Sequence, residues 1–202
     1  MNIKEFIINH FNFGFNFAVI PAIICLLLVV PCTFGLPPQY GYENGILENI
    51  QMVILLIAFI FSIKAKANKK FFIFIALLIL LFALREVNYG RTLFFPIPGQ
   101  ENMFYSWKEI KYGYLVNPIV GLYMAGMLIY FIVNKLYLVL WQYISKIKLP
   151  VINFIFLFVG IILSIYADKH THNFVFEEMS ELLLYSALAG IICLYAFNKD
   201  FR

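Results

Sequence analysis

Six apolar stretches, each about long enough to cross a membrane, constrain the fold of this chain more than any other feature. They cover residues 15–36, 46–63, 71–90, 112–133, 150–167 and 174–197. An α-helix needs about 20 residues to span the hydrocarbon layer, and none of these stretches shows the strict alternation of a membrane β-strand. The sequence therefore predicts an all-α fold, a polytopic transmembrane helical bundle of about six spans.

The composition excludes an ordinary soluble protein. Of the 202 residues, 63% are hydrophobic and 13% are charged, whereas soluble domains are closer to about one half and one quarter. No Ser/Gly-rich or low-complexity segment interrupts the chain. We therefore expect one transmembrane helical domain that covers residues 1–202.

The distribution of charge predicts how the bundle is oriented. If both termini lie in the cytoplasm, the cytoplasmic segments hold ten of the fifteen basic residues, in keeping with the positive-inside rule. These ten are Lys4, Lys64, Lys66, Lys69, Lys70, Lys135, Lys146, Lys148, Lys199 and Arg202. Nine of the eleven acidic residues fall on the opposite side, so the net charge of +4 is a difference between two faces and does not indicate nucleic acid binding. We predict a protein of the bacterial cytoplasmic (inner) membrane.

Two further segments have the composition of membrane-surface elements. Residues 134–149 are too short to cross the membrane again and combine aromatic residues with lysines, which is typical of an interfacial helix. Residues 94–99 contain Pro96 and Pro98 and cannot form a regular helix. Together with the aromatic residues that follow, this loop forms either a lid over the outer end of the bundle or an aromatic belt at the membrane surface.

The outer halves of three spans carry charged residues at a depth where lipid would surround them. Counting about 20 residues from the lysines at the inner ends places four carboxylates and one arginine there. They are Glu48, Glu86, Glu178, Glu181 and Arg85. A charged side chain in hydrocarbon costs about 2.5 kcal/mol or more. We therefore predict that Arg85 contacts at least one of Glu48, Glu86 and Glu181.

The polar residues of each helix share one face. Pairs three or four positions apart are Glu48 with Gln51, Arg85 with Tyr89, and Glu178 with Glu181. Two structural explanations compete with a functional one. A salt-bridge network around Arg85 would only hold the bundle together, and Glu177 and Glu178 could simply offset the dipole at the start of the last helix. Glu181 lies one turn deeper, where the dipole explanation does not apply.

Charge balance favours a site with a bound partner. Four carboxylates (−4) and Arg85 (+1) leave a formal charge of −3 in a region of low dielectric constant, where carboxylates cannot all remain ionised. Protons, Arg91, two nearby imidazoles or a divalent cation could neutralise this charge. Glutamate and histidine together suit zinc, iron or manganese, so a divalent metal ion is a candidate cofactor. The predicted metal ligands are His170, His172, Glu178 and Glu181.

Three segments resemble the signatures of an uncharacterised family of bacterial multipass membrane proteins. They are residues 43–51 (ENGILENIQ), 86–94 (EVNYGRTLF) and 177–182 (EEMSEL). The family typically has Glu-Asp-Gly-Leu-x-Glu-Trp-x-Gln at the start of one span, Glu-Ile-Ser-Trp-Gly-Gln-Arg at the end of the next and Glu-Glu-x-x-Glu-Leu at the start of the last. This chain has Asn49 and Tyr89 in place of two tryptophans, and it lacks an Asn-Leu-His-Asn element that often follows. The resemblance implies a multipass fold and marks positions, but it implies no reaction.

The leading hypothesis is a membrane-embedded enzyme, with or without a metal, that acts on a lipid or isoprenoid-type substrate at the outer leaflet. Buried carboxylates can serve as general acid and base, or they can hold a metal that activates water. The predicted catalytic residues are Glu181, Glu86 and Glu48. The predicted substrate-binding residues are Arg85, Arg91, Tyr89 and Gln51, with an arginine for an anionic head group.

Two other functions stay open. The acidic cluster would also suit a cation- or proton-coupled transporter, although a transport pathway needs polar residues in the inner halves of the spans, which are almost wholly apolar. Small-residue pairs, Gly121 with Ala125 and Ser186 with Gly190, allow close helix packing. Such faces would let the chain form a homo-oligomer or act as a structural subunit of a membrane complex. Membrane lipid is an expected partner in each case.

Overall fold

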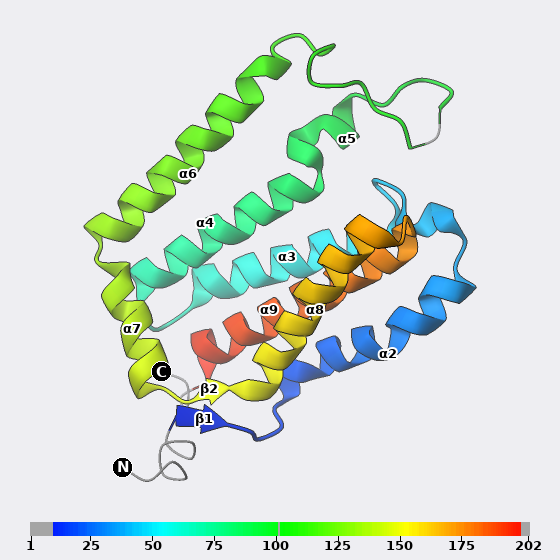
Figure 1. Ribbon diagram of the computed structural model, residues 1–202. Helices are drawn as coiled ribbons and strands as arrows, with labels where there is room; N and C mark the ends of the chain where they lie inside the picture. Colours follow the sequence, from blue (N-terminus) through cyan, green and yellow to red (C-terminus); the bar gives the residue numbers. More distant parts are fainter. Residues whose placement is uncertain (1–9, 101, 199–202) are drawn as a thin grey trace.

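In a computed structural model the chain is described over residues 10–100 and 102–198, and this part is mostly helical (Figure 1). Its α-helices are α2 (Ile20–Gly35), α3 (Ile46–Lys64), α4 (Lys69–Glu86), α5 (Arg91–Phe94), α6 (Val116–Val133), α7 (Leu136–Lys146), α8 (Val151–His170) and α9 (Phe174–Phe197). Short elements complete it: the 3-10 helices η1 (Phe17–Val19), η2 (Pro38–Gly41), η3 (Asn88–Gly90) and η4 (Gly113–Leu115), and the strands β1 (Phe11–Asn12) and β2 (Leu149–Pro150). The all-α prediction is confirmed.

Long apolar helices account for the predicted spans. Within the described residues, α2, α3, α6, α8 and α9, most of them extended by the 3-10 turns before them, are long and apolar enough to cross a membrane. Helix α4 qualifies together with the segment 88–94, from which it is bent by 57°. The helices therefore fit an integral membrane protein with five or six spans, close to the six predicted.

The predicted third span is too long at its outer end. Helix α4 ends at Glu86 and not near residue 90, because Tyr89 and Gly90 have positive φ angles of 53° and 89°. Left-handed backbone interrupts the helical hydrogen bonds, and glycine adopts it without steric cost. The chain therefore turns sharply after α4, and α5 begins with Arg91.

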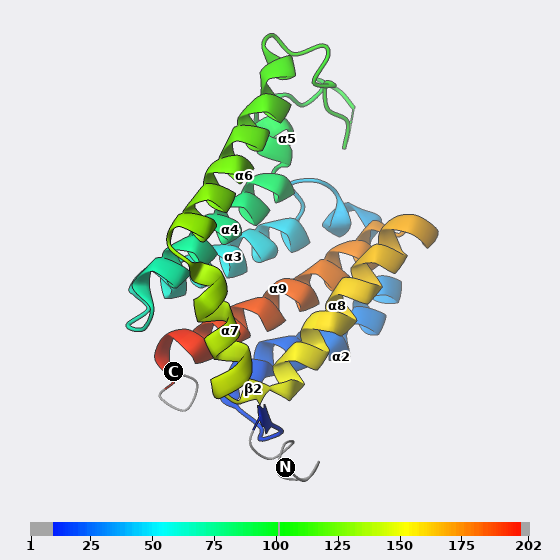
Figure 2. The same cartoon turned by 60° about the vertical axis from the view of Figure 1, so that its left-hand side comes forward.

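Helix α9 is the central helix of the bundle (Figures 1 and 2). It packs against α2, α3 and α8, and α3 packs in turn against α4. One apolar core, which includes Leu183, lies between α9, α2 and α8. A second, which includes Phe72, lies between α9, α3 and α4. Because neighbours surround α9, nearly every face of it contacts protein and not lipid.

Close approach to α9 depends on small residues. A Cβ atom at Gly190 would clash with the carbonyl oxygen of Ala18, and one at Gly160 of α8 would lie 2.8 Å from the Cα atom of Leu184. The close approach predicted at Gly190 is therefore confirmed. Gly121 of α6 differs, because a Cβ atom there would enter open space. The space beside Gly121 is thus not filled by the described part of the chain.

The two ends of the bundle differ in charge. Seven lysines lie at the end that carries the α3–α4 turn and α7: Lys64, Lys66, Lys69, Lys70, Lys135, Lys146 and Lys148. Helix α7 has 11 residues, too few for a span, and at this end β1 pairs with β2 in parallel (Figure 1). The acidic residues gather at the opposite end, where α4 ends and α9 begins. Lys4, Lys199 and Arg202 of the predicted cytoplasmic set lie outside the described residues.

Candidate functional site

The acidic end of the bundle contains a cavity of about 260 Å³ between α3, α4 and α9, which we call the carboxylate cavity. Its wall consists of Glu43, Glu48, Arg85, Glu86, Asn88, Tyr89, Glu177, Glu178 and Glu181. The consecutive helices α3 and α4 and the distant helix α9 thus bring the predicted catalytic residues Glu48, Glu86 and Glu181 together. A bilayer-embedded helix tolerates such residues only where they face one another, water or a ligand.

Arg85 pairs with the buried carboxylate of Glu181 in this wall. Its Nη2 atom donates a hydrogen bond to Glu181 Oε1 over 3.0 Å, and its Nε atom lies 3.9 Å from Glu86 Oε1. The predicted contact of Arg85 is therefore confirmed. The side chains of Glu181 and Glu86 are only 8% and 6% exposed, whereas that of Arg85 is 58% exposed. From α8, Ser164 Oγ also donates to Glu181 Oε1, over 3.3 Å. Glu181 is thus held from two neighbouring helices at once.

Tyr185 holds the second predicted catalytic carboxylate. Its hydroxyl donates to Glu86 Oε1 over 2.5 Å, and the residue is buried one turn beyond Glu181 on α9. A phenol bonded to a carboxylate forms a short network through which a proton can pass. The pair therefore extends the polar site one helical turn into the bundle.

Gln51 supports a carboxylate and does not reach the cavity. Its Nε2 atom donates to Glu178 Oε2 over 2.7 Å and to the backbone carbonyl of Glu178 over 2.8 Å. The residue is completely buried and is not part of either cavity wall. Its geometry therefore favours positioning of Glu178 over the predicted contact with substrate.

Glu48 is enclosed, yet one of its oxygens has no partner. The residue is 4% exposed, and its Oε2 atom accepts the backbone N–H of Asn44 just before α3. The buried Oε1 atom has no hydrogen-bond partner among the described residues. A buried carboxylate oxygen without a donor is costly. Since Glu48 lines the carboxylate cavity, a ligand in that cavity would be the nearest donor from outside the protein.

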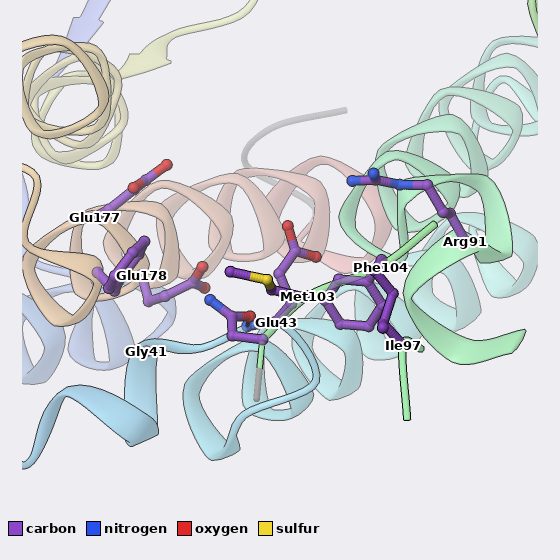
Figure 3. Close-up of a pocket in the computed structure, with 10 residues that line it drawn as sticks. Gly41, Glu43, Arg91, Ile97, Met103, Phe104, Glu177 and Glu178 are labelled. Carbon is purple, nitrogen blue, oxygen red and sulfur yellow. Dashed lines mark hydrogen bonds between the residues drawn. The ribbon is translucent and has the colours of Figure 1, made fainter. Parts of the chain in front are cut away.

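A second cavity of about 420 Å³ adjoins the first, and we call it the rim cavity (Figure 3). Its wall consists of Gly41, Glu43, Arg91, Ile97, Asn102, Met103, Phe104, Phe174, Glu177 and Glu178. Glu43, Glu177 and Glu178 belong to both walls, so the two cavities are neighbours. Figure 3 shows Arg91 extending over the cavity from one side, opposite Glu177 and Glu178 of α9.

The proline-rich loop after α5 forms part of the rim. Pro96 and Phe104 form an isolated antiparallel bridge, which folds this loop back on itself. The backbone N–H of Glu43 donates to Asn102 Oδ1 over 3.0 Å, so the loop also binds the segment before α3. Two roles were predicted for this loop, a lid and an aromatic belt. Its position in the cavity wall favours the lid.

The predicted metal site is not assembled. Within residues 10–100 and 102–198, no group of three or more His, Cys, Asp or Glu side chains could hold a metal ion. His170 and His172 are exposed and belong to neither cavity wall. The ring of His170 contacts that of Tyr166, one turn earlier in α8, with 5.2 Å between centroids and a tilt of 39°. The side chains of Glu178 and Glu181 bond to Gln51 and Arg85 and not to the histidines.

Two site residues were not singled out by the sequence pattern. Tyr185 follows Glu181 by four positions and so shares its helical face, a signal that the sequence did contain. Ser164 gave no such signal, because only the packing of α8 on α9 brings it to Glu181. Of the predicted substrate-binding residues, Tyr89 lines the carboxylate cavity and Arg91 lines the rim cavity.

Comparison with known proteins does not narrow the function. No protein-family model matches the chain, and no curated protein and no solved structure is significantly similar to it. The function therefore has to be argued from the two cavities and their chemistry.

Proposed function

We propose that the protein is an enzyme embedded in a bacterial cytoplasmic membrane, and that it acts on a lipid at the acidic end of the bundle. The observation that carries this proposal is the carboxylate cavity, about 260 Å³ of space between three helices. A salt-bridge network that only stabilised the bundle would match its charges and fill its own space. The two cavities instead combine six carboxylates with two arginines: Glu43, Glu48, Glu86, Glu177, Glu178 and Glu181, with Arg85 and Arg91.

Glu86 and Glu181 are suited to proton transfer. Both approach the guanidinium of Arg85, and Glu86 also accepts the hydroxyl of Tyr185. Both carboxyl groups line the carboxylate cavity and so face a substrate that is bound in it. Together they can serve as general acid and general base for a substrate in the cavity.

A lipid substrate is favoured by the surroundings of α9. At the acidic end, Arg85 of α4 and Ser164 of α8 both bond to Glu181. Further along α9, a cavity of about 190 Å³ is lined by apolar and aromatic residues of α4, α7, α8 and α9, such as Phe154 and Leu188. A hydrocarbon chain could lie along α9 between α4 and α8 while its head group occupies the carboxylate cavity. The apolar wall gives less support to a transporter, because an ion needs polar groups along its path.

Conversion of lipid by the purified protein tests this proposal. Wild-type protein in detergent is incubated with a total bacterial lipid extract, and the lipid species are followed by mass spectrometry. We expect the wild type to convert at least one species and Glu181→Gln to convert it about 10²-fold more slowly or worse, which is the typical contribution of a general acid or base. The melting temperature of both proteins is measured in parallel.

Glu109→Gln is the matched control. Glu109 lies in the loop between α5 and α6, where its Oε2 atom accepts the Ser106 backbone N–H over 2.7 Å. This bond lowers the pKa of the exposed carboxyl, which lines neither cavity. The control should convert lipid like the wild type. A Glu181→Gln protein that melts earlier but converts lipid at the wild-type rate would show that the cluster is structural.

Orientation is a second part of the proposal. The lysine-rich end should face the cytoplasm, with both termini on that side, because basic residues flanking spans are retained there. Reporter fusions after Lys70 and after Arg202 should then read as cytoplasmic, and a fusion at Gly99 as external. A cytoplasmic signal at Gly99 would invert the orientation and move the site to the other leaflet.

A further inference from the structure

We infer that the two cavities select a phospholipid head group with a primary ammonium group beside its phosphate. This inference rests on the proposed function, since it names the substrate class of the same site. Three observations carry it: a buried acceptor without a donor, a buried donor without an acceptor, and an excess of negative charge around both.

The acceptor is Glu48 Oε1. Glu48 is 4% exposed and lines the carboxylate cavity, and its other oxygen already accepts the backbone N–H of Asn44. Oε1 is buried and lacks a partner within the described part of the chain. A carboxylate only accepts hydrogen bonds, whereas a primary ammonium group offers three N–H donors. A ligand ammonium would therefore satisfy the one oxygen of Glu48 that the protein leaves unbonded.

The charge of the cavity walls also favours a ligand that carries a positive group. Six carboxylates (−6) and two guanidinium groups (+2) give the joined cavities a formal charge of −4. A head group with only a phosphate would increase this excess, whereas one that also carries an ammonium group adds no net charge and brings its positive end to the carboxylates.

The donor is Arg91 Nε. This atom is buried without an acceptor, and Arg91 forms no ion pair with any other described residue. Arg85, in contrast, is already bonded to Glu181. A free guanidinium binds phosphate through two parallel hydrogen bonds. Because the rim cavity adjoins the carboxylate cavity, one head group can place its phosphate at Arg91 and its ammonium group at Glu48.

Binding is measured from the melting temperature of detergent-purified protein titrated with three lipids that have identical chains. Phosphatidylethanolamine has the primary ammonium group, phosphatidylcholine has a methylated one without N–H, and phosphatidylglycerol has none. We expect phosphatidylethanolamine to half-saturate at an about tenfold lower concentration than phosphatidylglycerol, the equivalent of one charge-assisted hydrogen bond. Phosphatidylcholine should also bind more weakly than phosphatidylethanolamine. Equal binding of all three lipids would overturn the inference, and equal binding of the two amine lipids would overturn the role of Glu48 Oε1.

Variants locate the two halves of the head group. Glu48→Gln retains an oxygen for the Asn44 N–H but places an NH₂ donor where the acceptor was, so it should abolish the preference for phosphatidylethanolamine. Arg91→Gln should weaken the binding of all three lipids by a similar factor, because each carries a phosphate. Glu109→Gln should leave all three unchanged. A Glu48→Gln protein that keeps the full preference contradicts the inference.

A second acidic variant covers the case in which Glu48→Gln does not fold. Glu177 lines both cavities and lies near the start of α9, and its side chain accepts no hydrogen bond within the described residues. Glu177→Gln should therefore fold and reduce the same preference by lowering the negative charge. An unchanged preference in a folded Glu177→Gln protein would also contradict the inference.

Two further measurements separate the possible failures. Calcium or magnesium chloride that stabilises the protein and removes the lipid preference would identify an inorganic cation as the ligand and overturn the inference. Selective binding of phosphatidylethanolamine without conversion of any lipid would support the inference while contradicting the enzyme. If the wild type converts only lipids without an amine, and Glu181→Gln abolishes this conversion, the proposed enzyme function stands. The inferred preference for an ammonium head group is then wrong.

Discussion

Helices α9 and α6 are both long, apolar and of similar mean hydropathy, yet they lie in opposite surroundings. Within their most apolar stretches, 78% of the residues of α9 are buried in the bundle, against 6% for α6. Helix α9 carries Glu177, Glu178 and Glu181 and the closely approached Gly190, whereas α6 has no charged residue at all. Lipid solvates an apolar side chain about as well as protein does. Polar and small residues, and not hydropathy, therefore distinguish the interior helix from the peripheral one.

Different forces hold the two helices. Helix α6 contacts the bundle through few side chains, among them Tyr123, whose hydroxyl donates to the Leu77 carbonyl over 2.7 Å. Helix α9 is held by tight backbone approach and by the polar contacts of Glu181 and Tyr185. Paired substitutions on the two helices test this contrast directly.

Enlarging a glycine should give the largest difference. Gly190→Leu should destabilise the protein by about 3 kcal/mol or more, because the new side chain would collide with the backbone of Ala18. Gly121→Leu should change stability by about 1 kcal/mol or less and in the stabilising direction, because the space is open and leucine favours a helix. Unfolding in mixed detergent micelles measures both. Similar losses at the two positions would mean that α6 is packed as closely as α9.

Truncating a leucine should give a smaller difference. Leu183 of α9 is 0% exposed and Leu128 of α6 is 59% exposed. Leu183→Ala should lower the free energy of unfolding by about 2 kcal/mol, because the cavity that forms removes van der Waals contacts. Transfer of the leucine side chain between lipid and protein interior adds little to this cost. Leu128→Ala should change stability by about 0.5 kcal/mol or less. The same unfolding measurement applies, and a large cost at Leu128 would indicate that a second copy covers α6.

Removing a hydroxyl should give the smallest difference. Tyr185→Phe takes the donor from Glu86 Oε1 and should cost about 1 kcal/mol, since the buried carboxylate loses its shortest hydrogen bond. Tyr123→Phe should cost about 0.5 kcal/mol or less, because the Leu77 carbonyl lies within α4 and has a helical N–H as second donor. Only Tyr185→Phe should also slow lipid conversion. If both variants convert lipid equally well, Tyr185 has no part in the chemistry.

The sequence by itself determined the class of the protein and the place of its polar site. Backbone groups in a bilayer must be satisfied within each segment, so length and apolar composition are sufficient to identify the spanning helices. The lysines then distinguished the two ends. The cost of a charge in hydrocarbon predicted that Arg85 contacts a carboxylate, and Glu181 is that partner.

Details of the site depended on backbone geometry that the pattern did not reveal. Left-handed angles at Tyr89 and Gly90 end α4 early, and the chain that follows carries Arg91 to the rim cavity. His170 contacts Tyr166 of its own helix and lines neither cavity, so the predicted metal ligands do not meet. Such turns arise from a few dihedral angles, which apolar length and charge counts do not encode.

Only the tertiary structure decided which polar groups have a hydrogen-bond partner and which do not. Gln51 and Glu48 lie on one face of α3, but Gln51 bonds to Glu178 while Glu48 Oε1 remains unbonded beside the cavity. Hydropathy equally gave no sign of the central position of α9, because its mean hydropathy is similar to that of the peripheral helix α6. Burial and pairing depend on which distant segments pack together, and in a bilayer apolar sequence alone exerts little preference among those arrangements.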